Sequence, residues 1–252
     1  MIMSIAIITG GSRGLGKDMA MQIAAKGNDV ILTYNSKKEE AEAVVTAIEK
    51  QGRKAVALHL DVSDTTSFAA FASAVTETLK RTWNRDTFDF LVNNAGFGIY
   101  ATFTETTEAQ FDQMVNVHFK GTFFLTQTLL PLMADGGRII NISTGLTRFT
   151  PAGNSVYAAV KGAIEVLTRY LAVELGPRGI VVNTVAPGAI ATDFEGGIVR
   201  DNKDFNQLVA SQIALGRVGQ PEDIGGVVAA LLSQETGWVN AQRIEVSGGM
   251  RL

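Results

Sequence analysis

The chain contains no cysteine, two histidines and five prolines among its 252 residues. Without cysteine it forms no disulfide and offers no thiolate to a metal. His59 and His118 are isolated in the sequence, with no carboxylate cluster around them. We therefore expect both to be packing residues and predict no metal site. No run of about 18 apolar residues is present, so no membrane span is predicted.

Charge is also scarce and nearly balanced. The formal net charge is −3, with neither a basic stripe nor a basic tail, which argues against a nucleic-acid partner. Met1-Ile2-Met3-Ser4 lacks the charged region of a signal peptide and leads straight into an expected strand. Together with the absence of cysteine, this predicts a cytoplasmic protein. The hydrophobic fraction of 46% is ample for a large core.

Apolar strand-like runs alternate with helical patterns along the whole chain. Several of the runs are apolar throughout, which is typical of parallel strands covered on both faces. Repeated strand–helix–strand units indicate a parallel sheet with right-handed crossovers. We expect one α/β domain over residues 1–252, a doubly wound Rossmann fold of about seven strands with helices on both faces. Strands are expected at 3–8, 29–34, 55–60, 88–92, 138–143, 180–185 and 243–246, helices at 17–26, 38–51, 63–81, 109–132, 155–175 and 221–232, and an irregular substrate loop at 188–219.

A glycine-rich turn joins the first expected strand to the first expected helix. Glycines there permit a tight turn and let a pyrophosphate approach the backbone, while the helix N-terminus offers N–H donors and a partial positive charge. The spacing is Gly-x-x-x-Gly-x-Gly, which departs from the general Gly-x-Gly-x-x-Gly fingerprint. We predict a dinucleotide site that includes Gly10, Ser12, Arg13, Gly14, Leu15 and Gly16.

The end of the second expected strand distinguishes between the two nicotinamide dinucleotides. Enzymes that use NAD commonly place an acidic residue there, but this chain has no carboxylate until Glu39. Basic and polar side chains can bind a ribose 2′-phosphate instead. We therefore predict NADP(H), held by Arg13, Asn35, Ser36 and Lys37. The alternative is that Lys37 and Lys38 only solvate the start of the next helix.

Tyr157 and Lys161 form a Tyr-x-x-x-Lys pair, and Ser143 precedes them. Residues four apart lie on one face of a helix. A nearby ammonium lowers the pKa of a phenol, which makes Tyr157 a candidate proton donor or acceptor for a carbonyl/alcohol pair. Ser143 is positioned to hydrogen-bond the same oxygen. Taken alone, the pair also fits a half-exposed tyrosine covered by a lysine stem.

Several short motifs occur in a fixed order with these residues. The chain resembles the short-chain dehydrogenases/reductases of about 250 residues over essentially its whole length. The resemblance rests on Thr9-Gly10-x-x-x-Gly14-x-Gly16, Asp61-Val62, Asn93-Asn94-Ala95-Gly96, Asn116, Ser143, Tyr157-x-x-x-Lys161 and Pro187-Gly188.

This resemblance implies roles for the motif residues. Asn116, Ser143, Tyr157 and Lys161 are expected to be catalytic, with Lys161 also on the nicotinamide ribose and Asn116 holding a water. Asp61 and Val62 are expected at the adenine, and Asn93, Ala95 and Gly96 along the cofactor cleft. Pro187, Gly188, Ile190 and Thr192 are expected beside the nicotinamide. Taken singly, Asn93-Asn94-Ala95-Gly96 also fits an ordinary turn, Asp61 a helix cap and Asn116 a helix-interior residue bonded to the backbone.

The substrate is less well defined. Aromatic residues in the loops after strand ends predict a largely apolar pocket, with Phe97, Tyr100, Phe149 and Phe194 as candidates alongside Ser143. We predict NADPH-dependent reduction of a ketone or aldehyde. The alternative is a 3-oxoacyl-[acyl-carrier-protein] reductase, although residues 97–102 lack the Arg-Asp pair common in those enzymes. A non-catalytic NADP-sensing regulator or a structural protein belongs to a different class. The resemblance further implies a homotetramer, or a dimer.

Overall fold

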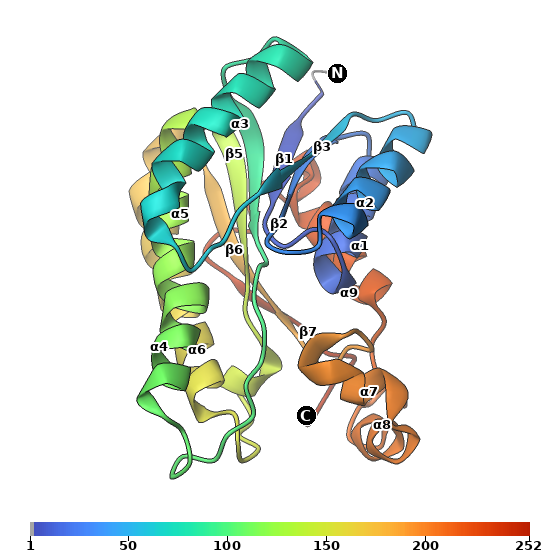
Figure 1. Ribbon diagram of the computed structural model, residues 1–252. Helices are drawn as coiled ribbons and strands as arrows, with labels where there is room; N and C mark the ends of the chain where they lie inside the picture. Colours follow the sequence, from blue (N-terminus) through green and yellow to red (C-terminus); the bar gives the residue numbers. More distant parts are fainter. Residues whose placement is uncertain (1–2) are drawn as a thin grey trace.

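The computed structural model describes residues 3–252, and these form a sheet of seven parallel strands (Figure 1). The strand order is β3-β2-β1-β4-β5-β6-β7. The predicted doubly wound α/β fold is therefore confirmed. The strands are β1 (Ile5–Ile8), β2 (Asp29–Tyr34), β3 (Ala55–His59), β4 (Phe88–Asn93), β5 (Met133–Ile142), β6 (Val181–Pro187) and β7 (Arg243–Val246).

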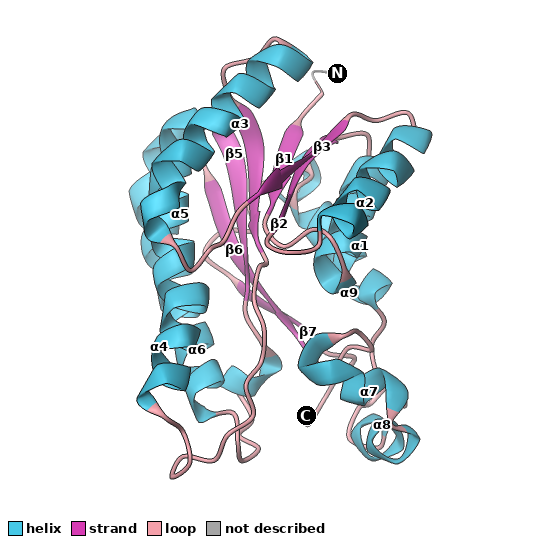
Figure 2. Cartoon of the chain, in the orientation of Figure 1, coloured by secondary structure: helices cyan, strands magenta, loops and turns pink. Residues whose placement is uncertain are grey.

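Helices cover both faces of the sheet, as Figure 2 shows. One face carries α1 (Gly14–Ala25), α2 (Lys38–Lys50) and α9 (Pro221–Leu231). The other carries α3 (Phe68–Trp83), α5 (Thr122–Leu129) and α6 (Ser155–Leu175), with α4 (Glu108–Val115) preceding α5. Two short helices, α7 (Ile198–Asp201) and α8 (Lys203–Ala210), lie beyond the strand ends. Among residues 3–252, no helix has both the length and the apolar character that crossing a bilayer requires.

The strand β1 illustrates why the sheet is buried. Successive side chains of a strand point to opposite faces. Ile5 and Ile7 belong to the core beneath α3 and α5, whereas Ala6 and Ile8 belong to the core beneath α1, α2 and α9. All four are fully buried. An uninterrupted apolar run thus supplies both cores, as expected for a central parallel strand.

The chain reverses its direction of travel across the sheet between β1 and β4. From β1 it moves outward to β2 and β3, and it then returns to place β4 on the other side of β1. Such a switch leaves a crevice at the carboxyl ends of the two strands. Hydrogen bonds connect the loops that follow these two strands. The Thr9 hydroxyl oxygen accepts from the backbone amides of Asn94 and Ala95, each at 2.9 Å. The Asn94 side chain donates to the Thr9 and Gly10 carbonyls.

Two expected elements differ in the structure. The helix expected at 109–132 is divided into α4, a π-helical turn at Asn116–Gly121 and α5. Gly121 lies so close to the loop after β3 that a Cβ there would be 2.1 Å from the Val62 carbonyl oxygen. The segment expected to be an irregular loop, 188–219, contains α7 and α8, because Asn202 caps α8 and Val209 packs in a small separate core.

Replacing Gly121 with alanine is expected to destabilise the protein by about 3 kcal/mol, because the new methyl group collides with backbone that cannot rotate away. Gly226, in the middle of α9, is the control, since a Cβ there meets nothing within 4 Å. Gly226→Ala is expected to be neutral or to stabilise by up to about 1 kcal/mol. Urea denaturation of both variants measures this. Equal stabilities would contradict the close approach at Val62.

Candidate active site

A cleft of about 1410 Å³ runs along the carboxyl ends of the strands. This is larger than the roughly 300–1,000 Å³ typical of pockets for drug-sized ligands, so it has room for a dinucleotide and a second molecule. The structure brings most of the predicted site residues together in its lining. They are Gly10, Ser12, Arg13, Gly14, Leu15, Gly16, Asn35, Ser36, Lys37, Asp61, Val62, Ala95, Gly96, Phe97, Tyr100, Ser143, Phe149, Tyr157, Lys161, Pro187, Gly188, Ile190, Thr192 and Phe194.

Two predicted residues lie outside this lining. Asn93 is buried, and its side-chain amide donates to the Thr126 hydroxyl at 3.0 Å and to the Asn141 side chain at 2.8 Å. Asn93 therefore links β4 to α5 and β5. The next residue, Asn94, lines the cleft at the position predicted for Asn93. Asn116 begins the π-helical turn, and its neighbours Val117 and His118 line the cleft in its place.

The glycine loop has the shape needed to receive a diphosphate. A Cβ on Gly16 would lie 2.0 Å from the Gly10 carbonyl oxygen, so only glycine permits this turn. Gly10 and Gly14 have φ of 65° and 53°, in the left-handed region that favours glycine. The first turn of α1 carries no acidic residue, so its N–H groups and positive dipole end face the cleft without a competing charge.

The predicted 2′-phosphate residues gather at the same end of the cleft. Arg13 comes from the glycine loop, and Asn35, Ser36 and Lys37 come from the turn after β2. All four are exposed or half-buried. Within residues 3–252, neither Arg13 nor Lys37 forms an ion pair, so both charges remain available to an anion. Asp61 lines the cleft and accepts hydrogen bonds from the Ser63 amide and hydroxyl at 2.8 and 2.7 Å. Its alternative role as a helix cap is wrong, because Asp64 caps the short helix that begins at Thr65.

Tyr157 and Lys161 lie side by side in the cleft wall on α6, both buried. The Lys161 Nζ atom is 5.8 Å from the centre of the Tyr157 ring and donates to the Ile142 carbonyl at 2.8 Å. Burial lowers the pKa of Lys161 to about 8. The pKa of Tyr157 moves upward, first because of burial and second because of the negative charge of Glu195.

The expected lowering of the Tyr157 pKa is therefore wrong. Desolvation of the buried phenolate dominates, and the charge of Glu195 acts in the same direction. Tyr157 consequently keeps its proton at neutral pH. A protonated phenol in a cleft wall is suited to donating a proton to a ligand oxygen.

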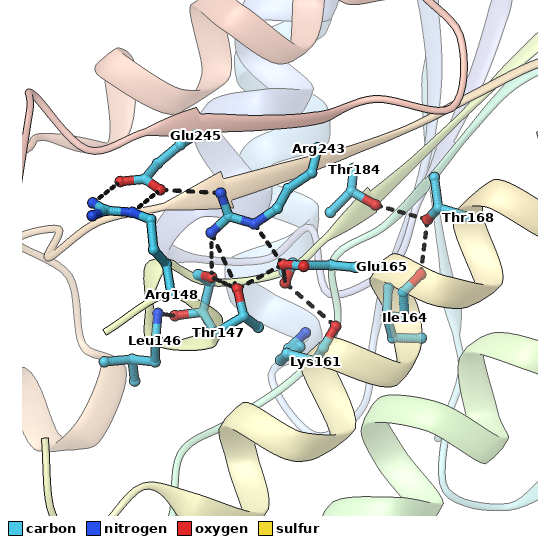
Figure 3. A network of polar contacts seen from close by, with 12 residues as sticks. Leu146, Thr147, Arg148, Lys161, Ile164, Glu165, Thr168, Thr184, Arg243 and Glu245 are labelled. Carbon is cyan, nitrogen blue, oxygen red and sulfur yellow. Dashed lines mark hydrogen bonds and ion pairs between the residues drawn. The ribbon is translucent and has the colours of Figure 1, made fainter. Parts of the chain in front are cut away.

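The hydroxyl of Ser143 bonds Glu165, which belongs to a polar network with Thr147 and Arg243 (Figure 3). It donates to Glu165 Oε1 at 2.7 Å and lies 3.4 Å from the Lys161 carbonyl. The same Glu165 oxygen accepts from Arg243 Nε and from the Thr147 hydroxyl, each at 2.8 Å. The only proton of the Ser143 hydroxyl is thus engaged by a carboxylate that two other donors also hold in place.

Thr144, which the sequence analysis did not select, offers another hydroxyl at the end of β5. Its backbone is extended, so its side chain points opposite to that of Ser143. It lines the cleft, and its Oγ1 accepts from the Leu146 amide at 3.2 Å, which leaves the hydroxyl proton available. The adjacent Ser143-Thr144 pair was the signal in the sequence, but only the fold determines which of the two hydroxyl protons is left available at the cleft.

His118 supports Tyr157 from within the protein. Its Nε2 is 2.8 Å from the Phe97 carbonyl oxygen, and its ring meets that of Tyr157 edge-on at a centroid distance of 5.3 Å. Burial, helped by the charge of Lys161, lowers the pKa of His118 to about 3, so the ring is neutral. The prediction that both histidines are packing residues is thus confirmed for His118 but wrong for His59, which is exposed and contacts the Tyr34 ring edge-on at 5.7 Å.

Comparison with known proteins agrees with this geometry. The family model described as Enoyl-(Acyl carrier protein) reductase matches residues 10–251. A short-chain dehydrogenase/reductase of Pestalotiopsis microspora is 35% identical over 256 residues, covering 97% of this chain and 94% of the relative. The tetrahydroxynaphthalene reductase PfmaG of Pestalotiopsis fici is also 35% identical, with 97% and 90% covered.

The chain belongs to the short-chain dehydrogenase/reductase family. The solved structure of the angucycline C-6 ketoreductase LanV with bound NADP superposes with a TM-score of 0.93 at 33% identity, covering 98% of this chain and 95% of that one. The predicted family and the class of enzyme, an oxidoreductase, are thereby confirmed.

Proposed function

We propose that this short-chain dehydrogenase/reductase uses NADPH to reduce a ketone or aldehyde to an alcohol. The observation that carries the proposal is Tyr157, a buried and protonated phenol in the wall of a cleft that also contains the glycine loop. The cofactor assignment is supported by the free charges of Arg13 and Lys37 and by the NADP bound to LanV. The reaction is supported by the similarity to a tetrahydroxynaphthalene reductase and to an angucycline C-6 ketoreductase.

Three residues of the chain are assigned roles in the proton transfer that accompanies reduction. When bound, NADPH supplies the hydride. Tyr157 donates its proton to the substrate oxygen as negative charge develops there. Lys161, held by the Ile142 carbonyl, stabilises the phenolate that remains. Asn116 keeps its predicted part in holding a water behind Lys161, and the π-helical turn that it opens is a feature common at functional sites.

We assign to Thr144 the hydroxyl that polarises the substrate carbonyl, the part predicted for Ser143. Thr144→Val, which keeps the side-chain shape, is expected to lower kcat/KM about 10- to 100-fold and to cost about 1 kcal/mol of stability through the lost Leu146 bond. Ser143→Ala is the matched variant. It is expected to cost about 1 kcal/mol of stability through the lost Glu165 bond, with kcat/KM within about fivefold of the parent. The reverse pattern would return the role to Ser143.

The proposed activity is tested by following NADPH oxidation against a panel of carbonyl compounds, with NADH in parallel. The panel comprises aliphatic ketones, aldehydes, polyhydroxylated aromatic ketones and an acetoacetyl thioester. Turnover of free ketones, faster with NADPH than with NADH, is the expected result. Faster turnover of the thioester would favour the acyl-carrier-protein alternative, and tight NADPH binding without any turnover would favour the regulator.

We also infer that the enzyme is cytoplasmic and assembles as a homotetramer. The support for assembly is a set of exposed apolar side chains on α5 and α6: Phe123, Phe124, Val166, Tyr170 and Val173. Val173 is 77% exposed and Tyr170 64% exposed, and apolar patches of this kind commonly mark interfaces.

A further inference from the structure

One carboxylate stands out at the substrate end of the cleft. Glu195 lines it together with Phe97, Phe194 and Tyr157, where the surroundings are otherwise mainly aromatic. Its φ of 50° lies in the left-handed region, which a residue other than glycine seldom adopts. Such backbone strain persists only when surrounding contacts hold the residue in place.

The contacts that hold Glu195 come from the loop after β4. A Cβ on Gly98 would lie 2.6 Å from Glu195 Oε1 and 2.7 Å from its Cγ, so the carboxylate group rests directly over this glycine. The neighbouring Phe194 ring packs against Tyr157 at a centroid distance of 5.8 Å. Glu195 is therefore positioned near the phenol, and its negative charge contributes to the raised pKa of Tyr157.

The other charged groups near this end of the cleft already have partners. Asp193 is paired with Arg200. Arg251 donates to the Gln212 side chain at 2.7 Å and stacks on Phe149 at 5.2 Å. In the part of the chain that the structure describes, Glu195 has neither an ion pair nor a hydrogen-bond donor, and partial burial raises its pKa. Because Glu195 is exposed in the cleft lining, the donors left for its carboxylate are solvent and a bound ligand.

We propose that Glu195 is a specificity-determining residue, which accepts a hydrogen bond from a hydroxyl or ammonium group of the ketone and repels substrates that carry a carboxylate. This inference rests on the proposed carbonyl reduction at Tyr157. Two carboxylates close together repel each other even when Glu195 is exposed, so the discrimination against an anionic ketone should be about tenfold.

The test uses three aryl methyl ketones with one skeleton: unsubstituted, hydroxyl-bearing and carboxylate-bearing. Glu195→Gln is expected to raise the ratio of kcat/KM for the carboxylate ketone to that for the unsubstituted ketone by about tenfold. Glu195→Ala is expected to lower the ratio for the hydroxyl ketone by about tenfold. Asp193→Asn is the control, because its charge is already neutralised by Arg200, and it should leave both ratios as in the parent.

Unchanged ratios in both Glu195 variants would overturn the proposal, as would an equal rise in Asp193→Asn. Calorimetric binding of the same three ketones to protein loaded with NADP+ gives a second readout that does not depend on turnover. If the parent oxidises no NADPH with any ketone, the proposed function fails, yet the calorimetric ratios still decide whether Glu195 discriminates by charge.

Discussion

Tyr157→Phe is expected to reduce kcat by about 10²- to 10⁴-fold while NADPH binding stays close to that of the parent. The substitution removes one oxygen and leaves the buried ring, so its contacts with His118 and Phe194 are kept. The loss is confined to the proton that the substrate oxygen needs as negative charge develops on it. Steady-state kinetics with the best ketone, together with fluorescence titration of NADPH, measure the two effects separately.

Tyr170→Phe is the matched control for this result. Tyr170 lies on the same helix, α6, but is 64% exposed and far from the cleft lining. Its loss of a hydroxyl should leave kcat unchanged. If kcat of Tyr157→Phe stays within about tenfold of the parent, Tyr157 is not the acid, and the proposed mechanism fails even if the fold assignment stands.

The double variant Arg13→Ala/Lys37→Glu is expected to weaken NADPH binding about 100-fold and to leave NADH binding nearly unchanged. Each residue offers a charge-assisted hydrogen bond to a 2′-phosphate, worth about 1.5–3 kcal/mol, and the new glutamate adds repulsion. NADH lacks the 2′-phosphate, so losing these contacts should not change its affinity. Dissociation constants for both dinucleotides, measured at one fixed salt concentration, provide the comparison.

Lys38→Glu separates the two interpretations of this basic turn. Lys37 lines the cleft, whereas Lys38 begins α2 outside it. If the lysines only solvate the start of the helix, Lys38→Glu and Lys37→Glu should have the same small effect on NADPH. Equal losses for NADPH and NADH in the double variant would mean that the loop was damaged generally and would contradict a 2′-phosphate site.

The strands and the glycine loop could be predicted because their signals are local. Ile5–Ile8 is apolar at every position, and this alone indicates a strand covered on both faces. The turn at Gly10–Gly16 follows it directly, so a short stretch of sequence contains the strand, the phosphate-binding turn and the helix start.

The interruption of the helix at Asn116 was missed because its cause lies elsewhere in the chain. The periodicity of residues 109–132 is that of a continuous helix, and it does not reveal that Gly121, at the end of the π-helical turn, packs against the Val62 carbonyl. Similarly, α7 and α8 depend on packing with Met250 near the end of the chain, which the pattern of residues 188–219 does not reveal.

By itself, the sequence determined the doubly wound sheet, the dinucleotide loop and the Tyr157–Lys161 pair, because each is encoded by residues close together in the chain. Only the tertiary structure decided that Glu165 engages the Ser143 hydroxyl proton while that of Thr144 stays available at the cleft, that burial raises rather than lowers the pKa of Tyr157, and that Glu195 lies near that phenol. These three properties depend on which residues that are distant in the sequence lie next to one another in the fold. Neither the spacing nor the composition of the sequence specifies those contacts.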